Sequence, residues 1–250
     1  MNRSNSHNKV AAIIQARVGS TRLPNKVLKD LCGKPVLWHV WNRLRQSKTI
    51  DEIVIATTTL TEDDAIEKFC SENNISFSRG SSDDVLDRYY NAAKNYSADT
   101  IIRITADCPL IDPQVVDKVV DTFLNGNYDY ASNCIKRTFP RGFDTEVFSF
   151  LTLEKTHLNA TQQHEREHVT SFIYTHKDLF SIGSYEDKVD RSFHRWTVDT
   201  PEDFLLIEEI YTALYPIKQL FLFEDILKLF DERPELFDIN HNVEQKKLGE

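Results

Sequence analysis

A cationic loop follows the first apolar segment of the chain and is the first candidate for chemistry. Its basic residues are Arg17, Arg22, Lys26 and Lys29, and no carboxylate interrupts them before Asp30. Gly19 lets the backbone approach a ligand closely, and Ser20 and Thr21 add hydroxyls and amides, so the loop could enclose a triphosphate. Its spacing matches neither the P-loop nor the GxGxxG dinucleotide motif, and a solvated basic loop is the alternative interpretation.

Two aspartates, Asp107 and Asp199, each follow an apolar segment that reads as a strand, the second of them ending at Val198. The carboxyl ends of parallel strands meet at one edge of a sheet, so we expect these two side chains to lie close together. Mg²⁺ prefers one or two carboxylates together with phosphates and water, and this pair suffices for a metal site. For either aspartate alone, an ordinary loop or helix-start carboxylate is the alternative, and Asp199 does precede the helix-start pair Thr200 and Pro201.

These groups predict nucleotidyl transfer. An acceptor oxygen would attack the α-phosphorus and pyrophosphate would leave in line, a reaction that depends mainly on positioning and charge neutralisation. Arg17 and Lys26 would hold the β- and γ-phosphates, while Mg²⁺ held by Asp107 would bridge phosphate oxygens. Base recognition is assigned to the loops after the second and third strands, at Thr57, Thr58, Arg79, Gly80 and Ser81.

The elements that must position these residues alternate along the chain. Apolar runs, which predict strands, lie at residues 10–16, 52–58 and 99–105. Apolar side chains recur at helical spacing within 36–44 and 115–123, so each segment can cover one face of a sheet. Thr61 is an expected N-cap, and so is Asp112, which Pro113 follows at the first helical position. The pattern predicts a three-layer α/β fold with a mostly parallel sheet.

Composition narrows the class of partner. Of 250 residues, 30 are Lys or Arg and 39 are Asp or Glu, and the resulting net charge of −9 argues against nucleic acid. The first ten residues are polar, and no stretch approaches the ~18 apolar residues of a membrane span, so we expect a cytoplasmic protein without a membrane partner. The 4 cysteines are widely spaced, which predicts reduced and mostly buried thiols.

The strand and helix alternation also predicts the domain organisation. We expect a disordered tail at 1–9, a single nucleotidyltransferase domain at 10–240 and a C-terminal tail at 241–250. The alternation weakens at about 126–195, where aromatic and charged segments dominate. An insertion that carries acceptor-binding and dimerisation functions is expected there.

The segment AAIIQARVGSTRLPNKVL resembles the opening of the cytidylyltransferase family that makes CMP-activated acid sugars. That family's signature is Ala-Arg, three residues, Arg-Leu-Pro, one residue, Lys. Within the family the chain is most similar to the branch of spore-coat polysaccharide biosynthesis. The similarity continues through DVLDRYYNAA, RITADCPLID, PRGFDTEVFS, EREHVT and TVDTPEDF, and so covers nearly all of residues 10–210.

The resemblance implies a GT-A-like or Rossmann-like fold, CTP as the nucleotide, Mg²⁺ at Asp107 and Asp199, and a homodimer. The nucleotide-binding residues are then expected to be Ala16, Arg17, Gly19, Ser20, Arg22, Lys26, Thr57, Thr58, Arg79 and Gly80. The acceptor is expected to be a small anion such as a sugar acid, bound by Arg103, Arg137, Arg141, Asp144, Glu146 and His168. Enzymes for 3-deoxyoctulosonate carry Gln-Gly-Asp-Glu-Pro where this chain has residues 105–109 as TADCP, so a different acceptor is expected.

Other functions stay open at this point. His164, Glu165 and His168 spell the HExxH motif of zinc hydrolases, but the two residues between are charged, whereas the helix of such enzymes is buried and uncharged there. A glycosyltransferase that uses a nucleotide sugar is a second alternative, disfavoured because Asp107-Cys108-Pro109 lacks the second aspartate of a DxD motif. A catalytically idle nucleotide-binding module is a third.

Overall fold

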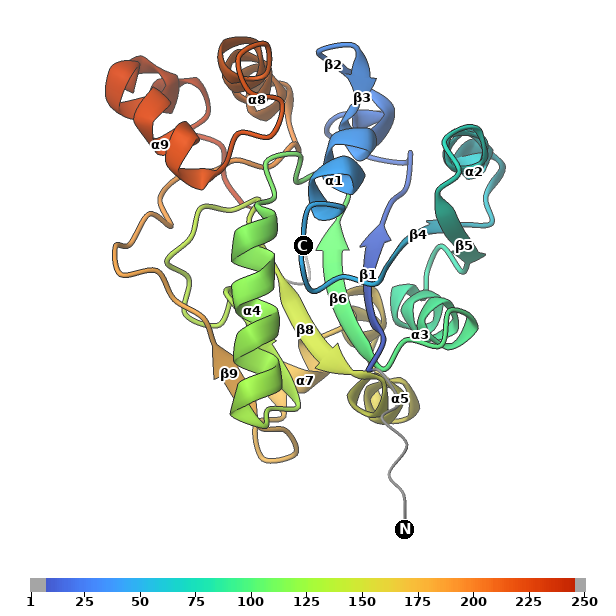
Figure 1. Ribbon diagram of the computed structural model, residues 1–250. Helices are drawn as coiled ribbons and strands as arrows, with labels where there is room; N and C mark the ends of the chain where they lie inside the picture. The colour runs from blue at the N-terminus through green and yellow to red at the C-terminus, as the bar shows by residue number, and fades with distance from the viewer. Residues whose placement is uncertain (1–7, 246–250) are drawn as a thin grey trace.

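A seven-stranded sheet forms the centre of the computed structural model, which describes residues 8–245 (Figure 1). Its strand order is β5-β4-β1-β6-β8-β7-β9. The pairs of β5, β4, β1 and β6 are parallel, β8 is antiparallel to both of its neighbours, and β9 is parallel to β7. The strands are β1 (Val10–Gln15), β4 (Glu52–Thr58), β5 (Ser76–Gly80), β6 (Thr100–Thr105), β7 (Tyr130–Ser132), β8 (Glu146–Ser149) and β9 (Ile182–Ser184).

Helices cover both faces of this sheet and give the molecule three layers (Figure 1). One face carries α1 (Val36–Leu44), α2 (Asp64–Glu72) and α4 (Pro113–Gly126). The other face carries α3 (Val85–Asn95), α5 (Phe150–Asn159) and α7 (Ser171–Thr175). The three-layer α/β fold with a mostly parallel sheet, predicted from the alternation of apolar runs, is therefore confirmed.

The central strand β1 explains why its sequence reads as an uninterrupted apolar run. Ala12 and Ile14 point into the core under α1 and α4, whereas Ala11 and Ile13 point into the core under α3. All four side chains are fully buried. A parallel strand with helices on both sides has no polar face, so its apolar residues do not alternate with polar ones.

A further apolar cluster surrounds Trp196 beyond the ends of β1 and β6, where α8 (Pro201–Leu214) and α9 (Phe223–Glu232) pack (Figure 1). Gly142 lies against this cluster with a φ of +105°, and a Cβ on it would stand 2.3 Å from the carbonyl oxygen of Trp196. Only glycine fits at such an approach. The chain before β8 is thereby held against the segment that leads to Asp199.

The region predicted as an insertion, about 126–195, supplies β7, β8 and β9 to the central sheet. It also contains α5, α7 and the short helix α6 (Gln163–Glu167). Its strands have only 3 or 4 residues each, which accounts for the weak strand signal in its sequence. The roles of this region in dimerisation and the domain boundaries at 10 and 240 stay predictions, and the tails lie largely outside the described residues.

The N-cap prediction for Thr61 is wrong. A 3₁₀ helix spans Thr61–Asp63, and α2 begins after it at Asp64. Thr61 makes no capping hydrogen bond, because the turn is held instead by the Asp63 carboxylate, which accepts hydrogen bonds from the Val18 amide and the Thr58 hydroxyl. The local sequence signal for a cap at Thr61 is overridden by the contact between Val18 and Asp63.

The prediction of a strand that ends at Val198 is also wrong. The segment makes only an isolated bridge between Arg195 and Arg141. It cannot form a ladder because its amides have partners on different segments: the Trp196 amide donates to Arg141, and the Val198 amide donates to the carbonyl of Asp107. The second of these hydrogen bonds still brings Asp199 to the end of β6.

All 4 cysteines are free; Cys70 and Cys108 are buried, Cys134 is partly buried and Cys32 is exposed. Two of the four thiols are therefore buried, fewer than the prediction of mostly buried cysteines implies. Among the described residues, no helix has the length and apolar character needed to cross a membrane.

The predicted cap at Asp112 is confirmed and also ties two helices together. One carboxylate oxygen accepts hydrogen bonds from the amides of Gln114 at 2.8 Å and Val115 at 3.4 Å, at the start of α4. The other accepts a hydrogen bond from the Phe223 amide at 2.7 Å, at the start of α9. The helix that follows the Asp107 loop is fixed in this way to the C-terminal helices.

Asp112→Ala should lower the free energy of unfolding by about 2–4 kcal/mol, because it removes a helix cap and leaves the buried Phe223 amide without a partner. Urea denaturation measures the loss. Asp121→Ala in the same helix is the matched control: its exposed carboxylate has only a 3.9 Å ion pair with Lys118 among the described residues, and the change should stay below about 0.5 kcal/mol. Equal losses in the two variants would contradict the role given to Asp112.

Candidate active site at the carboxyl edge of the sheet

Three segments far apart in the sequence meet at Lys26, beyond the carboxyl ends of β1 and β6. Its ammonium donates hydrogen bonds to Oδ2 of Asp107 at 2.5 Å and to Oδ1 of Asp199 at 2.7 Å. The three side chains are only 12%, 20% and 15% exposed, so water screens these charges poorly. The structure therefore brings the expected phosphate-binding lysine and both expected metal ligands to one point.

Asp199 has two further cationic partners. Arg22 of the cationic loop lies 3.0 Å from its Oδ2, and Arg195 donates a hydrogen bond to the same oxygen at 2.8 Å. Arg195 is itself held by the fully buried Asp203, with Nε 2.9 Å from Oδ1. Asp203 also accepts hydrogen bonds at 3.1 Å from the amides of Asp199 and Thr200. Asp199 is thus fixed through its backbone as well as its side chain.

Sequence reasoning missed both Arg195 and Asp203. A signal existed for Asp203, which stands three residues after Thr200 and completes a capping box at the start of α8. No local pattern marks Arg195, because its partners are set by the packing of α8 against the segment before it.

Burial and nearby charges have opposite effects on the pKa values of Lys26 and Asp107. Burial by itself would lower the pKa of Lys26, but the carboxylates of Asp107 and Asp199 outweigh it and raise that pKa above its usual range. Burial by itself would raise the pKa of Asp107, but the Lys26 ammonium outweighs it and the pKa falls. Lys26 and Asp107 are therefore both charged at neutral pH.

The cationic loop is attached to the sheet through Asp63, which is fully buried and accepts a hydrogen bond from the Val18 amide at 2.6 Å. Gly19 follows, and a Cβ there would stand 2.6 Å from a carboxylate oxygen of Glu62. Arg17 is exposed and makes no ion pair within the described part of the chain. The loop is thus fixed at Val18, and Arg17 is left available for an anion.

Ser20 helps to shape the same loop. Its amide donates a hydrogen bond to the Val18 carbonyl at 2.8 Å, and its hydroxyl accepts a weak one from the Leu23 amide at 3.4 Å. These local turns leave Ser20 at the same end of the sheet as Arg22 and Lys26.

The other residues expected to bind the nucleotide lie at the carboxyl ends of β1, β4 and β5. Ala16 and Thr57 are buried there, and the Thr57 hydroxyl has no hydrogen-bond partner among the described residues. The Thr58 hydroxyl is already used, since it donates to Asp63. Gly80 ends β5, and a Cβ on it would stand 3.1 Å from the side chain of Arg88.

Arg79 is occupied by protein partners. Its guanidinium forms ion pairs with Asp64, at 2.7 Å, and with Glu67 on α2. It also donates hydrogen bonds to the carbonyls of Thr58 at 2.8 Å and Leu60 at 2.9 Å. These contacts fasten α2 to the end of β5, so the part of Arg79 expected to meet a base is already engaged.

A buried polar cluster lies beside the site, on the face of the sheet covered by α3 and α7. Arg103 of β6 forms an ion pair with Glu146, its register partner on β8. Glu146 also accepts hydrogen bonds from the hydroxyls of Tyr130 at 2.5 Å and Thr170 at 2.6 Å. His168 is half-buried nearby, and burial lowers its pKa while the charge of Glu167 opposes this. Arg103, Glu146 and His168 are thus together, as expected.

The remaining acceptor candidates, Arg137, Arg141 and Asp144, lie between this cluster and Asp199. Arg137 and Asp144 form a bidentate pair with hydrogen bonds of 2.6 and 2.8 Å. Arg141 has no ion pair or side-chain hydrogen bond among the described residues, and burial together with the Arg137 charge lowers its pKa. The Arg141 backbone pairs with the segment at Arg195. Arg141 is the cation of this group that is left for an anion.

The HExxH letters do not form a metal site. The helix α6 spans only Gln163–Glu167, and Glu165 accepts hydrogen bonds at 3.0 Å from the amides of Thr161 and Gln162 that precede it. The glutamate that would act as the base of a zinc hydrolase is therefore buried in a capping box. Residues 8–245 contain no cluster of three or more potential metal ligands at this helix or elsewhere.

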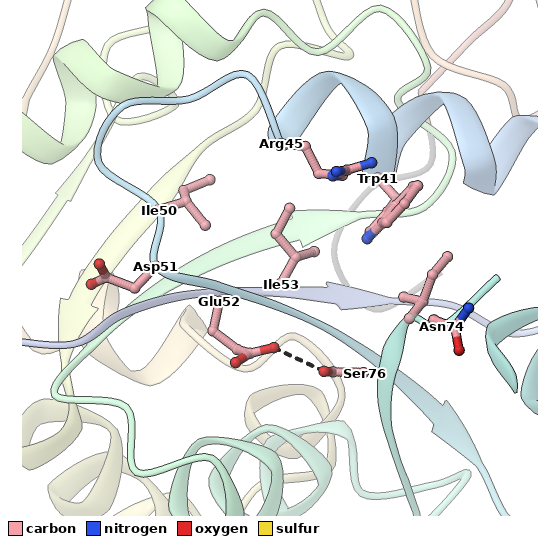
Figure 2. Close-up of a pocket in the computed structure, with 9 residues that line it drawn as sticks. Trp41, Arg45, Ile50, Asp51, Glu52, Ile53, Asn74 and Ser76 are labelled. Atoms are coloured by element: carbon pink, nitrogen blue, oxygen red, sulfur yellow. Dashed lines mark hydrogen bonds between the residues drawn. The ribbon is translucent and has the colours of Figure 1, made fainter.

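The cavity in Figure 2 lies at the opposite edge of the sheet. Glu52 and Ser76, joined by a hydrogen bond of 2.8 Å, begin β4 and β5, and Trp41 and Arg45 at the end of α1 lie over them (Figure 2). The cavity measures about 260 Å³. It is separate from the site at Lys26, which lies where the parallel strands end.

The donor set at Lys26 fits a hard divalent cation. Oδ2 of Asp107 and Oδ1 of Asp199 both lie within 2.7 Å of one ammonium nitrogen, so one cation can reach both carboxylates. Two carboxylate oxygens with room for phosphate and water are the ligands that Mg²⁺ prefers.

Three known proteins are similar to this chain over most of its length. A protein of Methanocaldococcus jannaschii, described as uncharacterised, is 41% identical over 244 residues, which are 97% of this chain and 98% of that protein. The spore coat polysaccharide biosynthesis protein SpsF of Bacillus subtilis is 34% identical over 213 residues, which are 82% of this chain and 87% of SpsF. The solved structure of a cytidylyltransferase from Leptospira borgpetersenii superposes with a TM-score of 0.88 at 34% identity, covering 96% of this chain and all of that one.

The family model described as cytidylyltransferase matches residues 11–247, from β1 past the last described helix. This range includes the cationic loop, both aspartates and the acceptor cluster. The chain belongs to the cytidylyltransferase family.

Proposed function

We propose that this protein transfers CMP from CTP to a small anionic acceptor, such as a sugar acid, with Mg²⁺ and with release of pyrophosphate. The observation that carries the proposal is the convergence of Lys26 with Asp107 and Asp199. Arg17, on the same loop as Lys26, and Arg141, whose backbone pairs with Arg195, have no ion pair among the described residues and are suited to binding anions.

The reaction forms a bond between an acceptor oxygen and the α-phosphorus and breaks the bond from that phosphorus to the oxygen bridging to the β-phosphate. Arg17, Arg22 and Lys26 would hold the triphosphate and offset the charge that builds up on pyrophosphate as it leaves. Asp107 and Asp199 would hold the metal, which when bound neutralises phosphate charge and polarises the α-phosphorus. The protein contributes position and charge.

The acceptor would place its anionic group on Arg141. Arg103 and Arg137 are already neutralised by Glu146 and Asp144 through short ion pairs, so they are better suited to shape the pocket than to take up a second anion. The hydroxyl and imidazole groups around them would bind the polar groups of a sugar.

The similarity to SpsF supports a role in surface polysaccharide biosynthesis. A homodimer and a cytoplasmic location are further parts of the proposal, and both rest on the family resemblance. The glycosyltransferase alternative is weaker, because Pro109 stands where a DxD motif has its second metal-binding carboxylate.

CTP should bind in preference to ATP or GTP, because the loop from Arg17 to Lys26 has the spacing of the cytidylyltransferases. Thermal unfolding with each nucleotide and Mg²⁺ measures the preference. A hundredfold excess over Kd corresponds to a stabilisation of about 2.7 kcal/mol. Equal or larger shifts with ATP would contradict the assignment of cytidine.

Asp107→Asn and Asp199→Asn should each lower Mg²⁺-dependent pyrophosphate release by about a hundredfold or more, because an amide keeps the shape but removes the charge that a hard cation needs. The double variant should be scarcely worse than either single one, since the two groups act as a unit. Asp121→Asn, exposed on α4, is the matched control and should keep full activity. Near-normal activity of Asp199→Asn, with an unchanged melting temperature, would reduce Asp199 to a helix-start residue.

Arg141→Met should raise the KM for the acceptor by about tenfold or more and leave the KM for CTP unchanged, because one charge-assisted contact to the acceptor is lost. Steady-state assays with a panel of sugar acids, including 3-deoxyoctulosonate as an acceptor expected to react poorly, provide the measurement. Lys136→Met is the control, since Lys136 is 72% exposed and pairs with Glu186. A rise in the KM for CTP instead would place Arg141 on the triphosphate.

A further inference from the structure

We propose a second role for Lys26, which rests on the proposed function: its ammonium is a built-in counter-ion that closes the Asp107–Asp199 pair to free divalent metal. The metal then enters the site together with the nucleotide. Lys26 leaves the carboxylates for the phosphates in the same event.

The first support is the position of the ammonium. Its nitrogen lies 2.5 Å from Asp107 and 2.7 Å from Asp199, on the two oxygens that face each other across the site. The other oxygen of Asp199 lies 3.0 Å from Arg22 and 2.8 Å from Arg195. A metal ion that binds both carboxylates has to take the place of the Lys26 ammonium.

The second support is the charge of the cluster. Three cations, Lys26, Arg22 and Arg195, face three carboxylates, those of Asp107, Asp199 and Asp203. A divalent ion added to this neutral cluster would meet repulsion from cations that water screens poorly. When the ion arrives with a triphosphate, the triphosphate brings negative charge, so the cluster gains no net positive charge.

The third support is the difference in how the cations are anchored. Arg195 is 7% exposed and is held by Asp203, so it stays beside Asp199. Lys26 and Arg22 belong to the cationic loop, which also carries the unpaired Arg17. Lysine places a point charge on a flexible four-carbon stem and can move to a phosphate without a change of backbone. Lys26 and Arg22 are therefore the cations that can leave Asp199 when a metal ion and a nucleotide bind.

The consequence is mutual dependence of the two ligands. If nucleotide removes Lys26 from the carboxylates, it raises the affinity for metal, and metal must then raise the affinity for nucleotide by the same factor. Free Mg²⁺ alone should leave the site largely closed.

Binding of Mn²⁺ without nucleotide, followed by the electron paramagnetic resonance signal of the free ion, tests the proposal. Lys26→Met should bind Mn²⁺ at least about tenfold more tightly than wild type, because the competing charge is gone while the length of the side chain is kept. Lys29→Met is the matched control in the same loop: the Lys29 ammonium lies over the Phe204 ring at 4.5 Å and makes no ion pair among the described residues. Its Mn²⁺ affinity should equal that of wild type.

Thermal unfolding distinguishes a folded variant from a damaged one. Lys26→Met leaves two carboxylates without their ammonium, so it should melt at a lower temperature than wild type, and Mn²⁺ should raise its melting temperature more than that of wild type. Arg22→Met, which removes a contact to Asp199 alone, should give the same changes to a smaller extent.

Two outcomes would overturn the proposal. If Asp107→Asn abolishes Mn²⁺ binding but Lys26→Met binds no more tightly than wild type, the counter-ion role fails while the proposed metal site stands. If no protein binds Mn²⁺ at the site, including wild type saturated with CTP, the metal site of the proposed function fails as well.

Discussion

The ion pairs of Lys26 connect the parts of this protein that are most distant in sequence. The loop after β1, the loop after β6 and the segment before α8 each end in a charge that is poorly exposed to water, and each charge is acceptable there only because the others are present. Burying these groups costs free energy, which the rest of the fold must offset. The apolar cluster around Trp196 and the capping box at Thr200 hold the third segment in place against that cost.

Pairing of charges continues outward from this centre and decides which groups remain for ligands. Arg103 is matched by Glu146, Arg137 by Asp144 and Arg79 by two carboxylates of α2. Arg17 and Arg141 are not matched by any carboxylate ion pair within residues 8–245. Arg17 lies on the loop after β1, and Arg141 lies on the segment before β8. A net charge of −9 thus coexists with a local preference for anions.

The sequence was informative where a rule links residue type to a place in a parallel sheet. Asp107 and Asp199 were expected together because both follow apolar segments. The rule for carboxyl ends places Asp107, whereas the segment at Val198 is no strand and Asp199 is brought there by the hydrogen bond from the Val198 amide to the Asp107 carbonyl. Asp112 was found because proline after an N-cap is a local signal. The fold itself was predictable from the alternation of buried runs and amphipathic segments, since both periods are properties of the chain alone.

The failures share a physical cause, which is that contacts formed only in the folded chain have priority over the local signal. Thr61 lost its capping role to Asp63, whose carboxylate is engaged by Val18, 45 positions away. Arg79 lies where a base contact was expected and is paired with carboxylates of α2, so its role in nucleotide binding stays a prediction. Arg195 has no signal in its own neighbourhood, because Asp203 becomes its partner only once α8 has formed. Such residues are identified by burial and contacts, which one sequence does not contain.

Arg166, one of the charged residues inside the HExxH letters, also has its role set by a partner far away in the sequence. Arg166 donates hydrogen bonds to both carboxylate oxygens of Asp84, the N-cap of α3, at 3.1 Å or less, and to the carbonyl of His157. The helix beside the acceptor cluster is thereby fastened to the helix that begins just after the expected base loop. A zinc hydrolase helix would need that arginine position to be uncharged, whereas an enzyme that aligns an acceptor with a nucleotide benefits from a rigid link between the two sides, because small errors in alignment cost rate.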